Sequence, residues 1–217
     1  MIVGSTKEDL LLEKRVSITP ETAKNIINLG LEVFIEKDYA THIGIQDKQY
    51  KEVGVAIKEL SEDVVKSCDL LTKVNFPLDI EVSNLKNKSI LVGMFNPSKN
   101  PIKFKKTLEK KINIFSLELL PRISRAQSMD VLSSQSNLAG YRAVIDSIYE
   151  FEKAIPMMMT AAGTVPAAKV LVIGAGVAGL QAIATAKRLG AIVSATDVRA
   201  ASKEQVESLG GKFLTVD

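Results

Sequence analysis

The chain has 217 residues, 46% of them hydrophobic, which is enough apolar material for one large core or two small ones. Its 28 basic residues against 25 acidic residues leave a net charge of +3, which excludes the strongly basic composition of a nucleic-acid-binding protein. The single cysteine excludes a disulfide framework, and no apolar run is long enough to predict a membrane span.

The first half of the chain alternates short apolar runs with amphipathic stretches. Its clearest helix start is Thr19-Pro20-Glu21, with a capping threonine, a proline and an acid in the first turn, and Gly30 ends that helix. We predict further helices over 50–53, 61–67 and 101–110, and strands over 1–3, 31–35, 55–57, 70–74, 90–95 and 112–117. Strands separated by helices indicate a mostly parallel sheet covered on both faces.

The pattern changes after Pro121, where a polar stretch leads into a helical pattern over about 131–153. Met157 and the two methionines after it are expected to fill gaps in a core or at a domain junction. The expected architecture is α/β, with two Rossmann-like parallel-sheet domains joined by a long helix, the second domain being incomplete. The predicted parts are an N-terminal domain over 1–130, an interdomain helix over 131–156 and a partial dinucleotide-binding domain over 157–217.

A glycine-rich motif lies in the last of these parts. The apolar run 169–173 has the composition of a buried parallel strand, and it leads into Gly174-Ala175-Gly176-Val177-Ala178-Gly179 and then a helix ending before Gly190. In this pattern Gly174 permits the tight turn, Gly176 lets the backbone approach a pyrophosphate, and Gly179 lets helix and strand pack closely. The helix N-terminus offers unpaired N–H groups to the same pyrophosphate.

The next strand, over 192–195, is followed by Asp197, Val198 and Arg199. A carboxylate at Asp197 can accept both ribose hydroxyls of adenosine and would repel a 2′-phosphate, which predicts NAD(H) rather than NADP(H). Arg199 weakens that preference, because an arginine nearby can hold a 2′-phosphate. The alternative is a tight turn that binds no ligand, but strand, motif, helix, strand and acid occur here in the required order.

Several stretches outside the motif resemble one family. Residues 121–135, continuing through 137–143, 157–166 and 197–199, are similar to the alpha subunit of proton-translocating NAD(P) transhydrogenases. The opening, 13–20, looks like the one that these proteins share with alanine dehydrogenases. The resemblance covers essentially the whole chain and is most specific from about 121 to 210.

The resemblance implies a function for the chain within a larger enzyme. In that family this subunit binds NAD(H), faces the cytoplasm or matrix, and passes hydride directly to NADP+ held by a separate domain, coupled to proton movement through a membrane domain. The expected partners are NADP(H)-binding and membrane-spanning subunits and a second copy of the chain. The expected location is the cytoplasmic side of the bacterial inner membrane, and the isolated chain is expected to be inactive.

The resemblance also implies a nicotinamide site made of Arg122, Gln127, Asp130 and Ser133. Gln127 and Ser133 can hydrogen-bond a carboxamide, and Arg122 and Asp130 can form a charge pair that fixes the geometry. The alternative is an ordinary polar loop between domains.

An alanine dehydrogenase is the competing enzyme. Amino-acid oxidation moves a proton as well as a hydride and needs an acid or base, whereas transfer between two nicotinamides needs positioning and exclusion of water. In alanine dehydrogenases a histidine follows the strand matched by 90–95, but this chain has Asn96 there, and its single histidine is His42. Arg15 and Lys73 match positions that bind the keto acid in those relatives, and here we expect structural charges or ion pairs.

The third strand of the motif region is predicted over 211–216, where the chain is about to end. A complete dinucleotide fold needs further strands for the nicotinamide half-site. In the family the remainder also supplies a mobile loop over NAD(H) and C-terminal helices. We therefore expect a fragment or a truncated product with an exposed sheet edge at Val216. A silent domain that only assembles with a partner is the third alternative.

Overall fold

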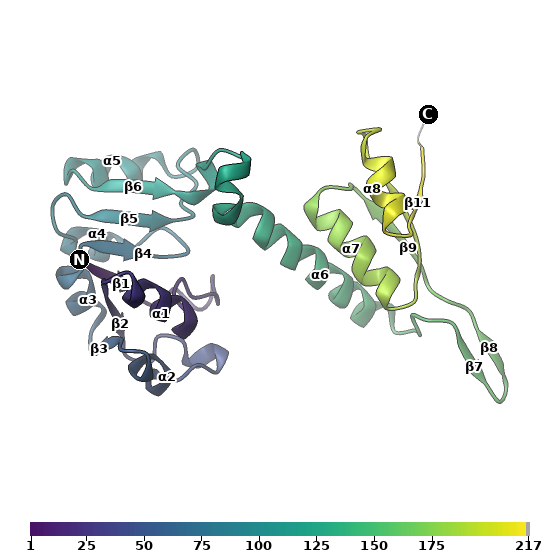
Figure 1. The fold of residues 1–217 in the computed structure, drawn as a ribbon, viewed down its shortest axis with the longest axis horizontal. Helices are drawn as coiled ribbons and strands as arrows, with labels where there is room; N and C mark the ends of the chain where they lie inside the picture. Colours follow the sequence, from purple (N-terminus) through teal and green to yellow (C-terminus); the bar gives the residue numbers. More distant parts are fainter. Residues whose placement is uncertain (216–217) are drawn as a thin grey trace. The chain divides into compact units, whose positions relative to one another are not determined.

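The computed structural model describes residues 1–215, except the side chain of Lys106, and these fall into two compact units. The first unit is Met1–Met129, and the second begins at Asp130 (Figure 1). The long helix therefore belongs to the second unit. None of the helices in the described residues combines the length and apolar composition that a membrane crossing needs.

The first unit is built on a six-stranded parallel sheet in the order β3-β2-β1-β4-β5-β6. Its strands are β1 (Ile2–Ser5), β2 (Glu32–Glu36), β3 (Ala56–Lys58), β4 (Leu70–Thr72), β5 (Ile90–Gly93) and β6 (Asn113–Ser116). Its helices are α1 (Pro20–Asn28), α2 (Asp47–Glu52), α3 (Ser61–Ser67), α4 (Asp79–Asn84) and α5 (Pro101–Glu109), with short 3-10 turns over Thr41–Ile43, Leu117–Leu119 and Ser124–Met129. The predicted α/β class with a parallel sheet is confirmed.

Both faces of this sheet are covered, as two adjacent residues of β1 show. Val3 is buried in a cluster with α1 and α2, whereas a Cβ built on the neighbouring Gly4 would lie 2.7 Å from the Cβ of Cys68, just after α3. The predicted cap of α1 is also present, because the Thr19 side chain accepts from the Thr22 N–H at 3.2 Å. Helix α4 was not predicted.

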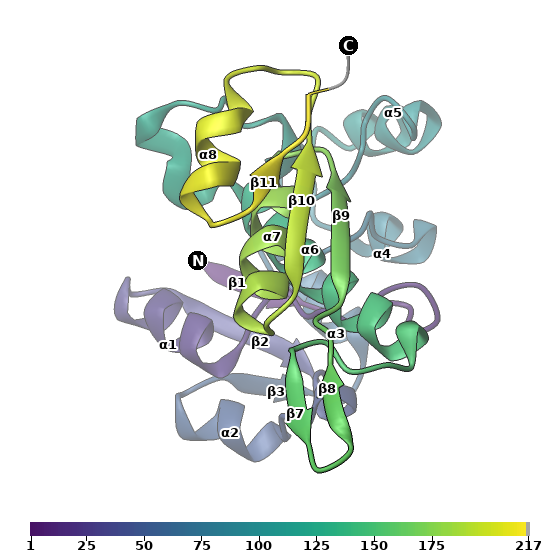
Figure 2. The ribbon, with the colours of Figure 1, turned by 90° about the vertical axis from the view of Figure 1, so that its right-hand side faces the viewer.

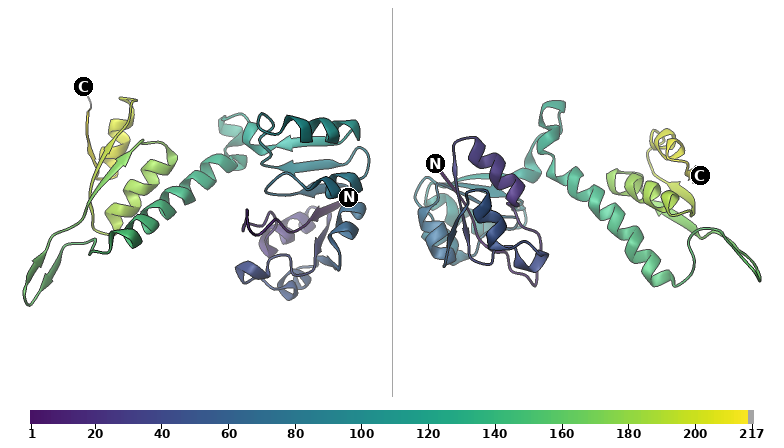
Figure 3. Two further views of the ribbon diagram at one scale, coloured as in Figure 1. Left: turned by 180° about the vertical axis from the view of Figure 1, so that it is seen from behind. Right: turned by 60° about the horizontal axis from the view of Figure 1, so that its bottom comes forward.

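The second unit begins with α6 (Val131–Phe151) and contains a three-stranded parallel sheet in the order β11-β10-β9. Its other elements are the hairpin β7 (Met158–Thr160) and β8 (Gly163–Val165), then β9 (Lys169–Ile173), α7 (Val177–Arg188), β10 (Ile192–Thr196), α8 (Ser202–Ser208) and β11 (Lys212–Phe213). Helix α6 runs alongside α7 in both views of Figure 3. The strand predicted to reach Val216 is shorter, and Val216 itself lies outside the described residues.

Two burial predictions are wrong in this unit. Strand β9 is present as predicted, but Leu171 is 58% and Ile173 81% exposed, because β9 pairs with β10 alone among the described strands. Met159 is 85% exposed and not in a core, since it lies on the hairpin that Figure 2 shows extending from the sheet, and the alternative place at a domain junction stays a prediction. The turn of that hairpin is held by Thr160, whose hydroxyl donates to the Gly163 carbonyl at 2.9 Å.

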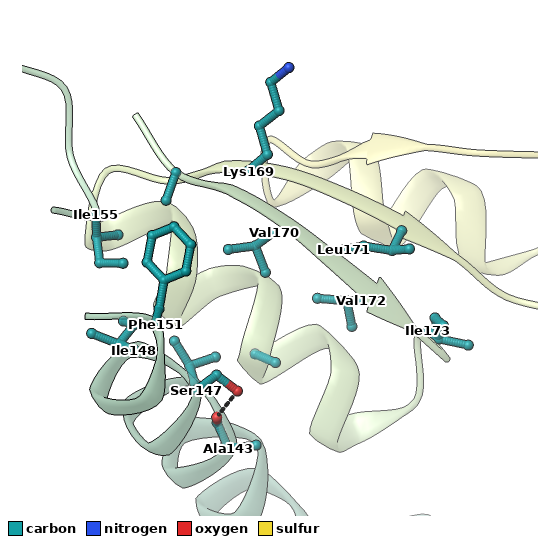
Figure 4. A pocket seen from close by; sticks show the side chains of 13 residues that line it. Ala143, Ser147, Ile148, Phe151, Ile155, Lys169, Val170, Leu171, Val172 and Ile173 are labelled. Carbon is teal, nitrogen blue, oxygen red and sulfur yellow. Dashed lines mark hydrogen bonds between the residues drawn. The ribbon is translucent and has the colours of Figure 1, made fainter. Parts of the chain in front are cut away.

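An apolar pocket of about 400 Å³ lies between β9 and α6. Figure 4 shows Val170 and Val172 of the strand facing Ile148 and Phe151 of the helix. The hydrogen bond drawn there stays within α6, from the Ser147 hydroxyl to the Ala143 carbonyl at 2.7 Å. With so few polar groups, this pocket does not have the chemistry of a dinucleotide site.

Candidate dinucleotide site

The glycine motif forms the tight turn from β9 to α7. Gly174 has a φ of +95°, which glycine adopts without strain, and its N–H donates to the Thr196 carbonyl of β10 at 2.8 Å. A Cβ built on Gly179 would lie 1.8 Å from the Gly174 carbonyl oxygen. The first turn of α7 therefore touches the end of β9 backbone to backbone, which is the close packing predicted for this glycine.

The N-terminus of α7 is open to a ligand. Gly176 is its N-cap residue, and no side chain caps the helix. A Cβ built on Gly176 would meet nothing within 4 Å, so the space over the loop is free. Uncapped N–H groups beside free space suit an anionic group such as a pyrophosphate.

Asp197 lies at the end of β10, directly across from the loop. Its carboxylate accepts from the Ala175 N–H at 2.7 Å and from the Arg199 N–H at 2.8 Å. The Arg199 side chain, followed by these two backbone N–H groups, holds the pKa of Asp197 well below its usual range. The carboxylate is therefore ionised at neutral pH and fixed beside the motif.

The cleft next to this carboxylate has a volume of about 650 Å³. It is lined by Ile173, Gly174, Thr196, Asp197, Val198, Ala200, Lys203, Phe213 and Thr215. Lys203 and Phe213 were not among the predicted site residues. Lys203 could have been found from its place in the first helix after the acid, whereas Phe213 reaches the cleft only because β11 pairs with β10.

The four residues expected at the nicotinamide are divided between the units. Arg122 and Gln127 are exposed in the first unit, around the turn Ser124–Met129. Asp130 and Ser133 begin the second unit, where Asp130 is the N-cap of α6. The Asp130 carboxylate accepts from the Ser133 N–H at 2.9 Å and from the Ser133 hydroxyl at 2.7 Å. These two residues thus have a capping role, and the nicotinamide role of all four stays a prediction.

Helix α6 and the motif are in direct contact. A Cβ built on Gly140 of α6 would lie 2.1 Å from the Ala178 carbonyl oxygen, in the first turn of α7. Only glycine fits at such an approach, so the backbone of α6 lies against the first turn of α7, within the glycine motif. Ser133 lies seven residues before Gly140, about 10 Å along the helix axis.

A second charged group lies in the first unit, at the carboxyl ends of β1 and β4. Lys73 is 5% exposed, and its Nζ donates to the Lys7 carbonyl at 2.6 Å, to the Thr6 hydroxyl at 3.1 Å and to Glu81 at 3.3 Å. Glu81 also accepts from Thr6. The expectation that Lys73 is an ion-pair partner is confirmed, and Arg15 likewise pairs with Glu13 at 2.6 Å.

Comparison with protein families decides the relationship. The model of the alanine dehydrogenase/PNT N-terminal domain matches residues 4–139, and that of the C-terminal domain matches residues 143–217. The chain belongs to the alanine dehydrogenase/PNT family.

Individual relatives favour the transhydrogenase branch. The chain is 52% identical over 222 residues to an NAD(P) transhydrogenase subunit alpha of Rhodospirillum rubrum, covering 100% of this chain and 58% of that protein. It superposes on a transhydrogenase from Sinorhizobium meliloti with a TM-score of 0.95 and 48% identity, covering 99% of this chain and 64% of that one. An alanine dehydrogenase of Methanococcus maripaludis is 28% identical, covering 99% of this chain and 58% of that protein. The resemblance found from the motifs is confirmed, and the chain spans little more than half the length of these curated relatives.

Asn96 is the position where the resemblance leads us to expect a histidine in an alanine dehydrogenase. Asn96 follows β5 with a φ of +47°, and its N–H donates to Glu118 at 2.5 Å. It lines a cleft of about 640 Å³ together with Lys73. The single histidine, His42, contacts the Lys14 carbonyl at 2.8 Å and does not line this cleft.

The buried carboxyl of Glu36 gives the stability of the first unit a testable pH dependence. Glu36 is 8% exposed, and burial raises its pKa despite the N–H bond from Lys7. The folded protein holds the proton of the Glu36 carboxyl more tightly than the unfolded chain does. The stability that this proton contributes is fully present below the ordinary pKa of glutamate and is lost as pH rises through the raised pKa of the folded protein. Glu36→Gln should therefore stabilise the protein at pH 7, and the gain should vanish towards pH 4.

Urea unfolding between pH 4 and pH 8 measures this effect. Glu32→Gln, at the exposed start of the same strand, is the matched control and should change little at any pH. Equal effects of the two substitutions would contradict the prediction.

Proposed function

We propose that this chain is the NAD(H)-binding part of a proton-translocating NAD(P) transhydrogenase. The observation that carries the proposal is the ionised Asp197 carboxylate held 2.7 Å from the Ala175 N–H of an open glycine loop. A carboxylate in that place accepts ribose hydroxyls and repels a 2′-phosphate. The free space over Gly176 and the uncapped N-terminus of α7 suit the pyrophosphate.

The residues of this chain bind and orient the cofactor. The bound nicotinamide supplies the hydride chemistry. We assign the nicotinamide end to Arg122, Gln127, Asp130 and Ser133, whose amide, hydroxyl and charged groups can fix the ring. Transfer to a second nicotinamide needs close, dry placement of two rings and no proton donor, which fits the absence of a histidine beside Asn96.

The remaining elements of the proposal concern partners. NADP(H) is held by a partner domain, and membrane-spanning subunits couple transfer to proton movement, with this chain on the cytoplasmic side of the membrane. A second copy of the chain is supported by the apolar stripe on α6, where Leu138 is 59%, Tyr141 50% and Tyr149 80% exposed. Residues at this spacing share one helix face, and large exposed apolar patches favour association.

Cofactor binding and transfer test the proposal directly. The chain should quench or shift NADH fluorescence on titration and bind NADPH more weakly, and Asp197→Asn should weaken NADH binding about ten- to hundredfold. Transfer from NADH to an NADP+ analogue should appear only when the NADP(H)-binding partner is added. Alanine-dependent reduction of NAD+ by the isolated chain would identify a dehydrogenase instead. Failure to bind NADH at all would favour the silent-domain alternative.

A further inference from the structure

The Asp197 carboxylate is already saturated with hydrogen bonds. Its Oδ1 accepts from the Arg199 N–H at 2.8 Å and from Arg199 Nε at 2.9 Å. Its Oδ2 accepts from the Ala175 N–H at 2.7 Å and from Arg199 Nη2 at 3.0 Å. A carboxylate offers about four lone-pair positions, and four donors occupy them here. Two ribose hydroxyls cannot bind this carboxylate until some of these donors leave.

Of these four donors, the two on the Arg199 side chain can move away from the carboxylate. It is 61% exposed, whereas the Asp197 side chain is 6% exposed, so the guanidinium covers the carboxylate from the solvent side. Most of the Arg199 side chain is already in solvent, so its departure exposes little buried surface. The two backbone N–H groups stay in place when it leaves, and they keep the carboxylate oriented.

We propose that Arg199 is an internal competitor for the adenosine ribose, which binds Asp197 in the absence of cofactor and must be displaced by the ribose hydroxyls. This inference rests on the proposed NAD(H) site and names the residue that sets its affinity and selectivity. While paired, the guanidinium lowers the affinity for a ribose diol. It also offsets the negative charge that repels a 2′-phosphate, so it reduces the difference between the affinities of the site for NAD(H) and for NADP(H).

Lys203 provides the matched control in the same cleft. Lys203 is the cation among the described lining residues, whereas Arg199 is beside the cleft through its bonds to Asp197, which is itself a lining residue. Removal of Lys203 takes one positive charge from the cleft and leaves the two bonds from the Arg199 side chain to the Asp197 carboxylate intact. Removal of Arg199 takes the same charge and also frees the carboxylate.

Adenine nucleotides test the competitor without involving the nicotinamide half of the site. ADP, 2′,3′-dideoxy-ADP and adenosine 2′,5′-bisphosphate are titrated calorimetrically into the full chain and into Arg199→Ala, Arg199→Lys and Lys203→Ala. Arg199→Ala should bind ADP roughly two- to fivefold more tightly, the range expected for breaking an ion pair whose cation lies in solvent, and should show no gain for the dideoxy nucleotide. It should bind the bisphosphate more weakly. Lys203→Ala should weaken all three ligands.

The outcomes separate this inference from the proposed function. Unchanged or weaker ADP binding by Arg199→Ala overturns the competitor and leaves the NAD(H) site standing. Binding by the variant alone supports the competitor, and binding by neither protein overturns both proposals. Arg199→Lys keeps the charge but not the two-pronged geometry, so an intermediate ADP gain is expected. If the alanine variant does not fold, the lysine variant decides, and no gain there overturns the inference.

Discussion

Gly179→Ala should destabilise the second unit by about 3 kcal/mol and abolish NADH binding. The new Cβ would lie 1.8 Å from the Gly174 carbonyl oxygen and 2.9 Å from its carbon, and neither backbone atom can turn aside as a side chain would. Helix α7 must move away from β9, and the N–H groups at its start move with it. Urea unfolding and NADH titration on the same protein measure the two effects.

Gly176→Ala is the control that separates binding from folding. Its φ of −77° is accessible to alanine, and its Cβ would meet no atom within 4 Å. The variant should therefore keep the stability of the parent and still bind NADH more weakly, because the methyl group occupies the space left for the pyrophosphate. Native stability in Gly179→Ala would show that the strand and helix do not pack as closely as described.

Lys73→Met should destabilise the first unit by about 3–5 kcal/mol. The Lys73 and Glu81 side chains are 4% and 8% exposed, so removing the cation leaves a carboxylate buried without its charge partner. The matched control is Lys37→Met, whose pair with Glu59 is 52% and 77% exposed and should be worth less than about 1 kcal/mol.

The double variant Lys73→Met with Glu81→Gln completes this experiment. It should recover much of the lost stability, because the uncompensated charge is removed along with its partner. Chemical denaturation at pH 7 provides all the values. A small cost for Lys73→Met would mean that Lys73 is free to serve a ligand, as in a dehydrogenase.

Short-range sequence patterns predicted the geometry of the glycine motif more accurately than they predicted which residues are buried. The turn at Gly174, the close packing at Gly179 and the position of Asp197 follow from one strand–turn–helix–strand unit, in which each residue acts on near neighbours. The exposure of Ile173 could not be predicted in this way, since an apolar strand has the same composition at the centre of a sheet and at its edge. Met159 shows the same ambiguity, because a hairpin and a core use the same apolar residues.

Long-range pairs were equally out of reach. The resemblance singled out Lys73, but its contact with Thr6 exists only because β1 and β4 are neighbours in the sheet, and its pair with Glu81 depends on α4, which was not predicted. The bond between Arg199 and Asp197 joins residues two apart, yet it depends on the chain turning directly after β10. A sequence pattern showed that both charges were present and did not show that they neutralise each other.

The contact between Gly140 and the Ala178 carbonyl fixes both the position of α6 along its axis and its rotation about that axis, relative to α7. With no side chain between the two backbones, the helix cannot slide or turn at that point. The cap formed by Asp130 and Ser133 is therefore set in height and direction by the number of residues that separate it from Gly140. One inserted residue in that interval would raise the cap by about 1.5 Å and rotate it by about 100°. The length of this segment therefore determines where the Asp130 and Ser133 side chains of the proposed nicotinamide site lie relative to the glycine motif.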